Sequence, residues 1–397
     1  MDQQHAPRSL HQATEAEIRA GLTTDVYFDR AVEIIRATGT DRPVRAEFTA
    51  KSLPGGAAWG IFAGLEEVAA LLQGRPIDVR AVPEGSFFRA YEPVMEVHGS
   101  YLEFAALETA ILGLICQSSG VATKAARIRI LAGDKTVASF GARRTHPAIA
   151  PVIERAAYLG GCDGVSVVKA ARILGADPTG TMPHSLVLLV GDTVEAALAY
   201  DRVLPREVPR IALIDTFNDE KFEAVRVAQA LGDRLWGVRL DTPSSRRGDF
   251  RRIVEEVRWE LDLRGFQHVR IIVSGGLDED DVVRLRDVVD AFGVGTSIAS
   301  AQTIDFGMDI VEIEGRPVAK RGKMSGAKEL WRCPASGQDW VLPLAQARLA
   351  VECASGEEPV RMLQPLLRGG QLVQELPAVR DIRAYVLDQL RTLSLVP

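Results

Sequence analysis

The chain has 397 residues, of which 47% are hydrophobic and 25% are charged, a composition typical of a folded chain with two or three domains. Its 53 acidic residues outnumber its 47 basic residues, and the formal net charge of -6 excludes binding to nucleic acid by bulk electrostatics. No uncharged apolar run approaches the length of a membrane span, and the polar N-terminus lacks the apolar core of a signal peptide. We therefore expect a chain that is neither exported nor embedded in a membrane.

The four cysteines do not form a Cys-x-x-Cys pair, and their sequence contexts are mixed; they are Cys116, Cys162, Cys333 and Cys353. This pattern predicts free thiols in a reducing compartment, and we expect a cytoplasmic protein.

The first part of the chain mixes helical and strand-like patterns. Residues 1–25 indicate a polar arm followed by a short helix. Strands are predicted at 45–49, 77–82 and 94–97, and helices at 60–72 and 101–131.

The sequence pattern changes near residue 137, from which point short apolar runs alternate with helical segments. The runs are 137–140, 164–168, 186–190, 211–215, 237–241, 269–274 and 291–295, and the helical segments are 148–159, 193–202, 220–231, 249–263 and 278–289. This alternation predicts a parallel sheet covered by helices. Seven or so such units favour a closed barrel over an open doubly wound sheet. After residue 304 we expect a strand-rich tail, with strands near 308–313 and 326–332, and a closing helix at 379–393.

The segment from Phe140 to His146 combines an aromatic residue, a glycine and two arginines, Arg143 and Arg144. An apolar face, close backbone approach and a cationic fork suit a small, flat, anionic ring. The alternative is a basic loop that follows an edge strand.

Two later runs end in glycine, at Ser274-Gly275-Gly276 and at Gly295-Thr296. Glycine lets backbone N–H groups approach phosphate oxygens, and a helix that starts behind them adds a favourable dipole. The alternative is a pair of tight strand-to-helix turns.

Two other runs end in a carboxylate, at Asp215 and Asp241. A carboxylate after four apolar residues is costly to bury unless it is paired, solvated or bound to a metal. The pair predicts a Mg²⁺ site or a site for ribose hydroxyls. The alternative is that each aspartate caps the helix that follows.

Basic residues lie at or just after the same strand ends: Arg143, Arg144, Lys169, Arg172, Arg239, Arg246 and Arg247. In a net-acidic chain this grouping indicates a site for anions, although Arg246 and Arg247 also fit a solvated loop. By themselves His184 would be a structural hydrogen-bonding residue and Asp163 a turn residue.

Together these segments resemble the nicotinate phosphoribosyltransferase family, among the type II phosphoribosyltransferases. The resemblance extends from about Thr24 to Arg332, and its markers are Thr24-Asp25-Val26-Tyr27, Ser139-Phe140-Gly141-Ala142-Arg143-Arg144, Gly161-Cys162-Asp163-Gly164, Gly180-Thr181-Met182-Pro183-His184, Arg239-Leu240-Asp241-Thr242, Ser274-Gly275-Gly276, Phe292-Gly293-Val294-Gly295-Thr296 and Lys323-Met324-Ser325.

For the ring, the resemblance implies that Phe140 stacks on the pyridine and that Tyr27 of a neighbouring subunit covers its other face. It implies that Arg143 binds the nicotinate carboxylate or an adjacent phosphate. Asp163 matches the family residue near the ring's substituent, which helps to discriminate acid from amide.

For the phosphoribosyl group, the resemblance implies that Arg239 and Asp241 hold ribose and pyrophosphate, with Asp215 nearby. His184 matches the histidine that is phosphorylated when family members couple the reaction to ATP hydrolysis. The remaining implied contacts to phosphate come from Arg144, Ser274, Gly275, Gly276, Gly295, Thr296 and either Lys323 or Lys328.

The resemblance implies an α/β fold: an irregular parallel α/β barrel plus an α/β open-faced sandwich domain formed by N- and C-terminal segments. We expect an arm at 1–25, the first part of the sandwich at 26–118, the barrel at 119–305, and a C-terminal segment at 306–397 that returns to the sandwich with its closing helix.

The expected reaction joins nicotinate and 5-phosphoribosyl-1-pyrophosphate, giving nicotinate mononucleotide and pyrophosphate. We expect Mg²⁺, held by Asp215 and Asp241, ATP as a co-substrate, and a homodimer or larger oligomer with active sites at the subunit interface. Some relatives carry a cysteine-rich zinc knuckle, but here two thiols do not complete a zinc site, so we expect no zinc.

Three alternatives remain. Quinolinate phosphoribosyltransferase would need more cationic residues around the ring and no phosphorylatable histidine. A nicotinamide-specific enzyme is not separated cleanly by Asp163 and Arg143. The third is a non-catalytic barrel that binds a phosphorylated metabolite.

Overall fold

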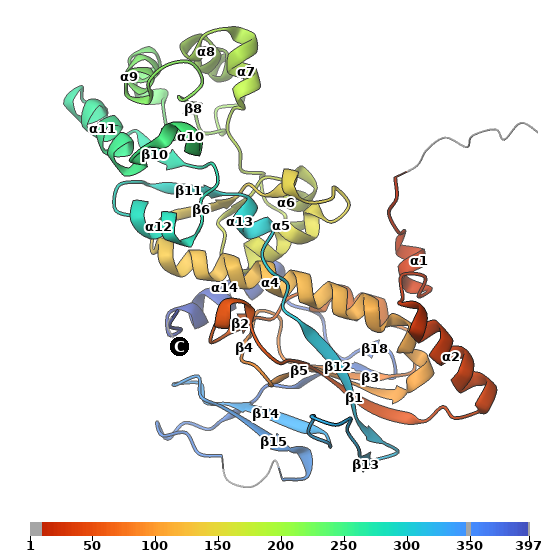
Figure 1. The fold of residues 1–397 in the computed structure, drawn as a ribbon. Coiled ribbons are helices and arrows are strands. Elements are labelled where there is room, and N and C mark those ends of the chain that lie inside the picture. Colours follow the sequence, from red (N-terminus) through yellow and green to blue (C-terminus); the bar gives the residue numbers. More distant parts are fainter. Residues whose placement is uncertain (1–9, 347–350, 396–397) are drawn as a thin grey trace, which may run out of the picture. The chain divides into compact units, whose positions relative to one another are not determined.

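The computed structural model describes residues 10–346 and 351–395, and the chain divides into two compact units, whose elements are labelled in Figure 1. Among the described residues, the first unit comprises 10–119, 303–346 and 351–377, and the second comprises 120–302 and 378–395. The start of the predicted arm, residues 1–9, lies outside the described residues. The predicted short helix is present as α1 (Glu15–Arg19), with Thr14 as its N-cap.

The first unit is built on a seven-stranded sheet with the order β13-β12-β1-β5-β3-β17-β18 and antiparallel pairing throughout. Helices α3 and α4 supply apolar side chains such as Leu72 and Ile111 to its core. The sheet strands are β1 (Pro43–Ala50), β3 (Asp78–Ala81), β5 (Pro93–Ser100), β12 (Phe306–Ile313), β13 (Arg316–Pro317), β17 (Gln364–Arg368) and β18 (Gln371–Leu372).

The unit's other elements are α2 (Val26–Thr38), α3 (Leu65–Leu72), α4 (Glu108–Ala132), the pair β2 (Gly60–Ile61) and β4 (Phe87–Phe88), and a three-stranded sheet of β14 (Lys328–Arg332), β15 (Asp339–Pro343) and β16 (Val360–Arg361). The predicted helix at 60–72 is thus a two-residue strand followed by a shorter helix. This difference follows from Gly64, whose φ of 96° is incompatible with a right-handed helix.

One helical stretch among the described residues, Tyr101–Ala132, is long and apolar enough to cross a membrane by length and composition alone. The prediction concerned uncharged runs, and this stretch is interrupted by charged residues such as Glu108 and Lys124. Core helices of folded domains pass the same test, and half of the most apolar window is buried. Its residues enter both cores, with Ile111 in the first unit and Val121 in the second.

The second unit is built on a six-stranded parallel sheet with the order β7-β6-β11-β10-β9-β8. Its strands are β6 (Thr136–Ser139), β7 (Gly164–Val165), β8 (Ile211–Leu213), β9 (Gly237–Leu240), β10 (Arg270–Val273) and β11 (Ala291–Val294). Its helices are α5 (Ala150–Leu159), α6 (Val168–Leu174), α7 (His184–Val190), α8 (Thr193–Val203), α9 (Glu220–Leu231), α10 (Ser244–Arg247), α11 (Phe250–Leu263), α12 (Glu279–Leu285), α13 (Thr296–Ala299) and α14 (Val379–Leu390).

The parallel α/β class is confirmed, but two details of the prediction are wrong. The apolar run at 186–190 forms most of helix α7, because a short apolar run fits a helix as well as a strand. The described strands leave β7 and β8 as edges, so the sheet is a half-barrel and the predicted closed barrel is not formed.

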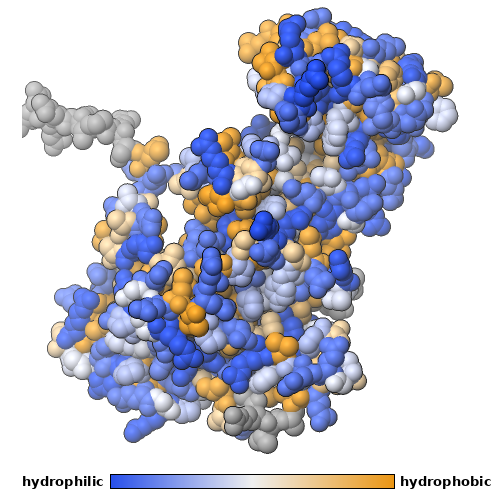
Figure 2. Space-filling view, turned by 180° about the vertical axis from the view of Figure 1, so that it is seen from behind, coloured by the Kyte–Doolittle hydropathy of each residue, from blue (hydrophilic) through white to orange (hydrophobic). Residues whose placement is uncertain are grey.

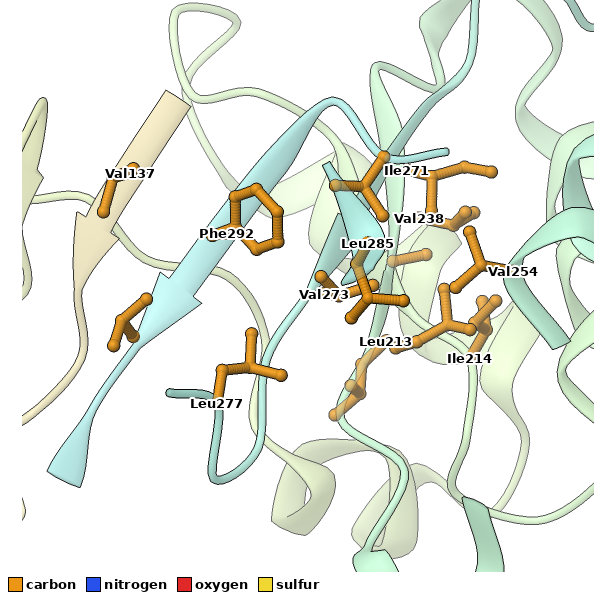
Figure 3. Close-up of a cluster of buried hydrophobic side chains, with 14 of the residues drawn as sticks. Val137, Leu213, Ile214, Val238, Val254, Ile271, Val273, Leu277, Leu285 and Phe292 are labelled. Atoms are coloured by element: carbon orange, nitrogen blue, oxygen red, sulfur yellow. The ribbon is translucent and has the colours of Figure 1, made fainter. Parts of the chain in front are cut away.

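The core of the second unit lies where the strands meet helices α11 and α12. Figure 3 shows Val238, Ile271 and Val273 of the sheet beside Val254 and Leu285 of these two helices. All five side chains are fully buried. The sheet therefore provides a rigid base for the residues that follow its strands.

The closing helix, α14, belongs to the second unit. Its Arg383 binds Asp163 and donates a hydrogen bond to the carbonyl of Cys162 at 3.0 Å. The prediction that this helix returns to the sandwich is therefore wrong. Amphipathic periodicity marks a helix but does not identify the surface on which it packs.

The surface carries isolated apolar side chains among polar ones, and Figure 2 shows this mixture on one face. Leu189, Val203 and Trp259 are among the most exposed. All four cysteines are free thiols, as predicted, and Cys162, Cys333 and Cys353 are buried.

Candidate active site

The candidate site lies at the carboxyl edge of the six-stranded sheet, the edge at which its parallel strands end. Ser274 directly follows β10 and Asp241 directly follows β9, whereas Asp215 follows β8 after one further apolar residue, Ile214. Because parallel strands end at one edge, these side chains gather there with Arg239 and His184. We call these five residues, His184, Asp215, Arg239, Asp241 and Ser274, the carboxyl-edge cluster.

His184 lies between the two aspartates. Its Nε2 atom is 3.6 Å from Asp241 Oδ2 and 3.8 Å from Asp215 Oδ2. Its Nδ1 atom is 3.0 Å from the hydroxyl of Thr216. The hydroxyl orients the ring, so that Nε2 faces the carboxylates and is available for proton or phosphoryl chemistry.

Asp215 is a buried aspartate whose carboxylate oxygens lack hydrogen bonds within the described part of the chain. The side chain is 1% exposed, and neither Oδ1 nor Oδ2 has a hydrogen-bond partner among the described residues. Burial raises the pKa of Asp215, and the nearby His184 opposes that shift. An ionised carboxylate in this state destabilises the fold, which indicates that it is kept for a ligand.

Arg239 is the cationic counterpart of Asp215. Burial lowers the pKa of its guanidinium below the ordinary value, and its Nε atom is buried without a partner. One terminal nitrogen lies 3.8 Å from Asp241 Oδ2. The guanidinium carbon also lies 5.9 Å from the centre of the Phe140 ring. Arg239 therefore connects the aspartates with the predicted ring-binding residue.

Asp241 is held in place by Ser274, whose hydroxyl donates a 2.7 Å hydrogen bond to Oδ1. Neither strand-end aspartate caps a helix, because Asp219 is the N-cap of α9 and Pro243 is that of α10. The capping alternative is therefore wrong for both residues.

The two glycine-containing turns flank this cluster. Gly275 and Gly276 have φ angles of 88° and 70°, a region in which only glycine is unstrained. A Cβ atom on Gly276 would meet nothing within 4 Å, so the backbone there is open to a ligand. Arg247 Nε donates to the Thr242 carbonyl at 2.7 Å, and its side chain also binds the Gly275 carbonyl. Arg247 is therefore not a freely solvated loop residue, whereas Arg246 is exposed.

Phe140 follows β6, and its N–H donates to the Val294 carbonyl at 2.9 Å. Its ring lies across β11, where a Cβ atom on Gly293 would come within 2.4 Å of the ring. This contact requires glycine at position 293. Arg143 and Arg144 are exposed in the turn beyond, and Arg144 Nε lies 3.4 Å from the Thr296 hydroxyl.

Asp163 lies at the opposite edge of the sheet and is not part of the cluster. It precedes β7 and accepts hydrogen bonds from the Val137 N–H at 2.8 Å, from Arg129 at 2.8 Å and from Arg383 at 2.6 Å. Its carboxylate holds α4, α14 and two strands together. The structure therefore shows a structural role for Asp163, and the ring contact implied by the resemblance stays a prediction.

Three predicted or alternative site residues belong to the first unit. Tyr27 is exposed on α2, and Lys323 pairs with Asp309. Lys328 is buried and forms an ion pair with Glu47 at 2.8 Å. The substrate roles implied for Tyr27 and Lys323 stay predictions.

Sequence reasoning missed two residues that shape the site. Thr216 orients His184, and its position directly after Asp215 was a usable signal. Glu154 is fully buried and accepts a 2.6 Å hydrogen bond from the Ser139 hydroxyl. The sequence pattern that could have revealed Glu154 is its spacing on α5, four residues after Ala150 and three before Ala157. These spacings put a glutamate on the buried, apolar face of the helix.

The donor set at the carboxyl edge fits Mg²⁺ better than a metal that needs several protein ligands. Among the described residues no group of three or more His, Cys, Asp or Glu could hold a metal ion. Mg²⁺ is often bound by one or two carboxylates together with substrate phosphates. The unpartnered oxygens of Asp215 and the nearby Asp241 meet that requirement.

The chain is similar to known proteins over most of its length. Residues 25–119 match the family model of the quinolinate phosphoribosyl transferase N-terminal domain, and residues 121–309 match that of the C-terminal domain. A nicotinate phosphoribosyltransferase of Mycobacterium tuberculosis is 31% identical over 94% of this chain and 91% of its own length.

Solved structures show the same fold over nearly the whole chain. A structure named nicotinate-nucleotide pyrophosphorylase from Pyrococcus furiosus is 52% identical, covers 97% of this chain and 99% of its own, and has a TM-score of 0.95. Human nicotinic acid phosphoribosyltransferase has a TM-score of 0.73 at 22% identity and covers 94% of both chains.

Proposed function

The chain belongs to the nicotinate phosphoribosyltransferase family, among the type II phosphoribosyltransferases, and we propose that it joins nicotinate to 5-phosphoribosyl-1-pyrophosphate. The products are nicotinate mononucleotide and pyrophosphate. The bond from ribose C1 to the pyrophosphate oxygen breaks, and a bond from C1 to the pyridine nitrogen forms. No covalent bond to the protein is needed, so the enzyme acts by positioning and by charge stabilisation.

The ring side of the proposed site consists of Phe140, Arg143 and Arg239. Phe140 offers an aromatic surface for the pyridine, and a cation near it pairs with the nicotinate carboxylate. The 5.9 Å distance between the Arg239 guanidinium carbon and the centre of the Phe140 ring supports this arrangement, because a ring stacked on Phe140 would have one guanidinium nearby. Arg143 is exposed and can turn towards the ring without losing a buried contact.

The phosphoribosyl side consists of the turns at Gly275–Gly276 and Gly295–Thr296 with the aspartates between them. Backbone N–H groups of these turns suit the 5′-phosphate. Asp215 and Asp241 would hold Mg²⁺, which neutralises charge on the pyrophosphate when bound. Arg239 and Arg247 add positive charge at the same edge.

His184 is the proposed phosphoryl acceptor if the reaction is coupled to ATP. Thr216 occupies Nδ1 at 3.0 Å, which leaves Nε2 as the nucleophilic nitrogen. The γ-phosphoryl group would pass from ATP to Nε2 and leave ADP, and its later hydrolysis would release phosphate. His184→Ala should abolish stimulation by ATP and leave some ATP-independent transfer, as measured by nucleotide formation with and without ATP.

The observation that carries the proposal is the pair of opposite charges Asp215 and Arg239 at the carboxyl edge, where both Asp215 oxygens and Arg239 Nε have no hydrogen-bond partner among the described residues. The test is an assay with 5-phosphoribosyl-1-pyrophosphate and Mg²⁺ plus nicotinate, nicotinamide or quinolinate, each with and without ATP. Pyrophosphate release with nicotinate as the preferred acceptor supports the proposal. Preference for quinolinate, with release of carbon dioxide, contradicts it and favours the first alternative.

We further propose a cytoplasmic enzyme that works as a homodimer or larger oligomer. The free thiols of all four cysteines support a reducing compartment. In the oligomer, Tyr27 of a neighbouring subunit would cover the ring. Size determination by light scattering, followed by mixing Tyr27→Ala chains with Phe140→Ala chains, tests this: mixed oligomers should recover activity if the site is shared.

A further inference from the structure

Glu154 is a buried carboxylate that the proposed chemistry does not use. It lies on α5 with no exposed surface. Its Oε1 accepts a 2.6 Å hydrogen bond from the Ser139 hydroxyl, and its Oε2 accepts a 2.5 Å hydrogen bond from the Ser166 N–H. The Ser166 hydroxyl and the Val167 N–H approach Oε2 at 3.4 Å. Both carboxylate oxygens are therefore satisfied.

The donors come from two neighbouring strand ends. Ser139 is the last residue of β6, and Ser166 directly follows β7. Val167 is the N-cap of α6, yet this helix has no side-chain cap hydrogen bond. Glu154 thus provides acceptors that the local chain lacks. Its carboxylate fixes the two strand ends relative to each other at the carboxyl edge.

The residue after Ser139 is Phe140, the aromatic residue of the proposed ring pocket. Phe140 is fixed on its other side by its N–H bond to Val294 and by the contact with Gly293. The turn that follows carries Arg143. The hydroxyl of Ser139 is therefore a side-chain anchor directly before the ring-binding segment, in addition to the strand pairing of Ser139, and Glu154 is the acceptor that holds it.

We propose that Glu154 is a positioning residue for the pyridine acid: through Ser139 it holds the segment Phe140–Arg143 in the geometry that binds the ring. This inference rests on the proposed function, and it assigns Glu154 no contact with substrate. Because Glu154 makes no hydrogen bond to β8, β9 or β10 among the described residues, and these strands precede Asp215, Asp241 and the Gly275–Gly276 turn, we expect a larger effect on the pyridine acid than on the phosphoribosyl substrate.

The test measures kcat and both KM values in Glu154→Gln, which keeps one carbonyl acceptor and places an amide N–H₂ against a donor. We expect KM for nicotinate to rise about 10-fold to 100-fold, with KM for 5-phosphoribosyl-1-pyrophosphate changed less than about threefold. Ser139→Ala removes the same link with less disturbance of the core, and it should raise KM for nicotinate about threefold to tenfold.

Asp201→Asn is the matched control, because Asp201 is also a bonded carboxylate, pairing with Arg210 and Arg234 before β8 and β9. It should lower the melting temperature and leave both KM values unchanged. Hydrogen exchange in the folded variants gives a readout besides activity: residues 139–146 should lose protection in Glu154→Gln and Ser139→Ala but keep it in Asp201→Asn.

Two outcomes overturn the inference in different ways. If the wild-type enzyme turns over nicotinate and both Glu154→Gln and Ser139→Ala keep its KM and the protection of residues 139–146, Glu154 is merely structural. If the wild-type enzyme does not turn over nicotinate at all, the proposed function fails and the inference fails with it.

Discussion

Aspartates at the two edges of the six-stranded sheet differ in their bonding. At the amino edge, where the parallel strands begin, Asp163 directly precedes β7 and Asp290 directly precedes β11. Each accepts a hydrogen bond from a backbone N–H of the neighbouring strand: Asp163 from Val137 at 2.8 Å and Asp290 from Ile271 at 2.7 Å. At the carboxyl edge, Asp215 and Asp241 follow their strands, and Asp215 has no hydrogen-bond partner among the described residues. The amino edge uses its charges to stabilise the fold, whereas the carboxyl edge keeps charges for a ligand.

The largest expected effect, and the strongest test of this difference between the two edges, comes from neutralising Asp241 at the carboxyl edge. Asp241→Asn keeps the shape of the side chain and the Ser274 hydroxyl next to it. We expect kcat to fall about 100-fold to 1000-fold, because a preorganised charge at the reacting group is lost. Steady-state kinetics with saturating nicotinate checks this, and a loss below threefold would contradict the role of Asp241.

Asp215→Asn should separate activity from stability. We expect activity to fall about 100-fold while stability at pH 7 rises by about 1–2 kcal/mol, because an unsatisfied buried carboxylate is removed. Thermal unfolding of the apo protein measures the change, and a lower melting temperature would show that the native carboxylate is satisfied.

The pH dependence of Asp215→Asn follows from the same cause. Burial raises the pKa of Asp215 in the folded state above its unfolded value. The wild-type protein should therefore match Asp215→Asn below the unfolded pKa and become the less stable of the two as the pH rises through the folded pKa. Unfolding in urea at several pH values tests this sign.

The amino edge should respond in the opposite way. Asp163→Asn weakens bonds to Arg129 and Arg383, and we expect stability to fall by about 1–2 kcal/mol, a value kept low because the carboxylate is 36% exposed. We expect kcat/KM with nicotinate to stay within about threefold. A large rise in KM for nicotinate without loss of stability would restore the ring contact implied by the family resemblance.

The smallest expected effect is that of Arg144→Ala. Arg144 is exposed, and its contact to Thr296 is long at 3.4 Å. We expect KM for 5-phosphoribosyl-1-pyrophosphate to rise about threefold to tenfold, since one solvated charge near a phosphate is lost. The change should shrink at high salt. No change at low salt would remove Arg144 from the phosphate side of the site.

The parallel strands and several site residues could be predicted from the sequence. The rule is that the residue directly after an apolar run that forms a parallel strand lies at the carboxyl edge of the sheet. Asp241 and Ser274 were placed correctly by that rule. Asp163 was not, because it precedes its strand and its partner Arg383 lies 220 residues further along the chain. The run at 186–190 was predicted as a strand but forms a helix, because five consecutive apolar residues have no periodicity that distinguishes a strand from a helix.

The central claim is that the charged residues of the carboxyl-edge cluster bind the phosphoribosyl substrate. Titration calorimetry with 5-phosphoribosyl-1-pyrophosphate and Mg²⁺ tests it on the wild-type protein, on Arg239→Ala and on the amino-edge variant Asp290→Asn. We expect Asp290→Asn to bind as tightly as the wild-type protein and Arg239→Ala to bind at least about 30-fold more weakly. Equal affinity for Arg239→Ala and the wild-type protein would contradict the account.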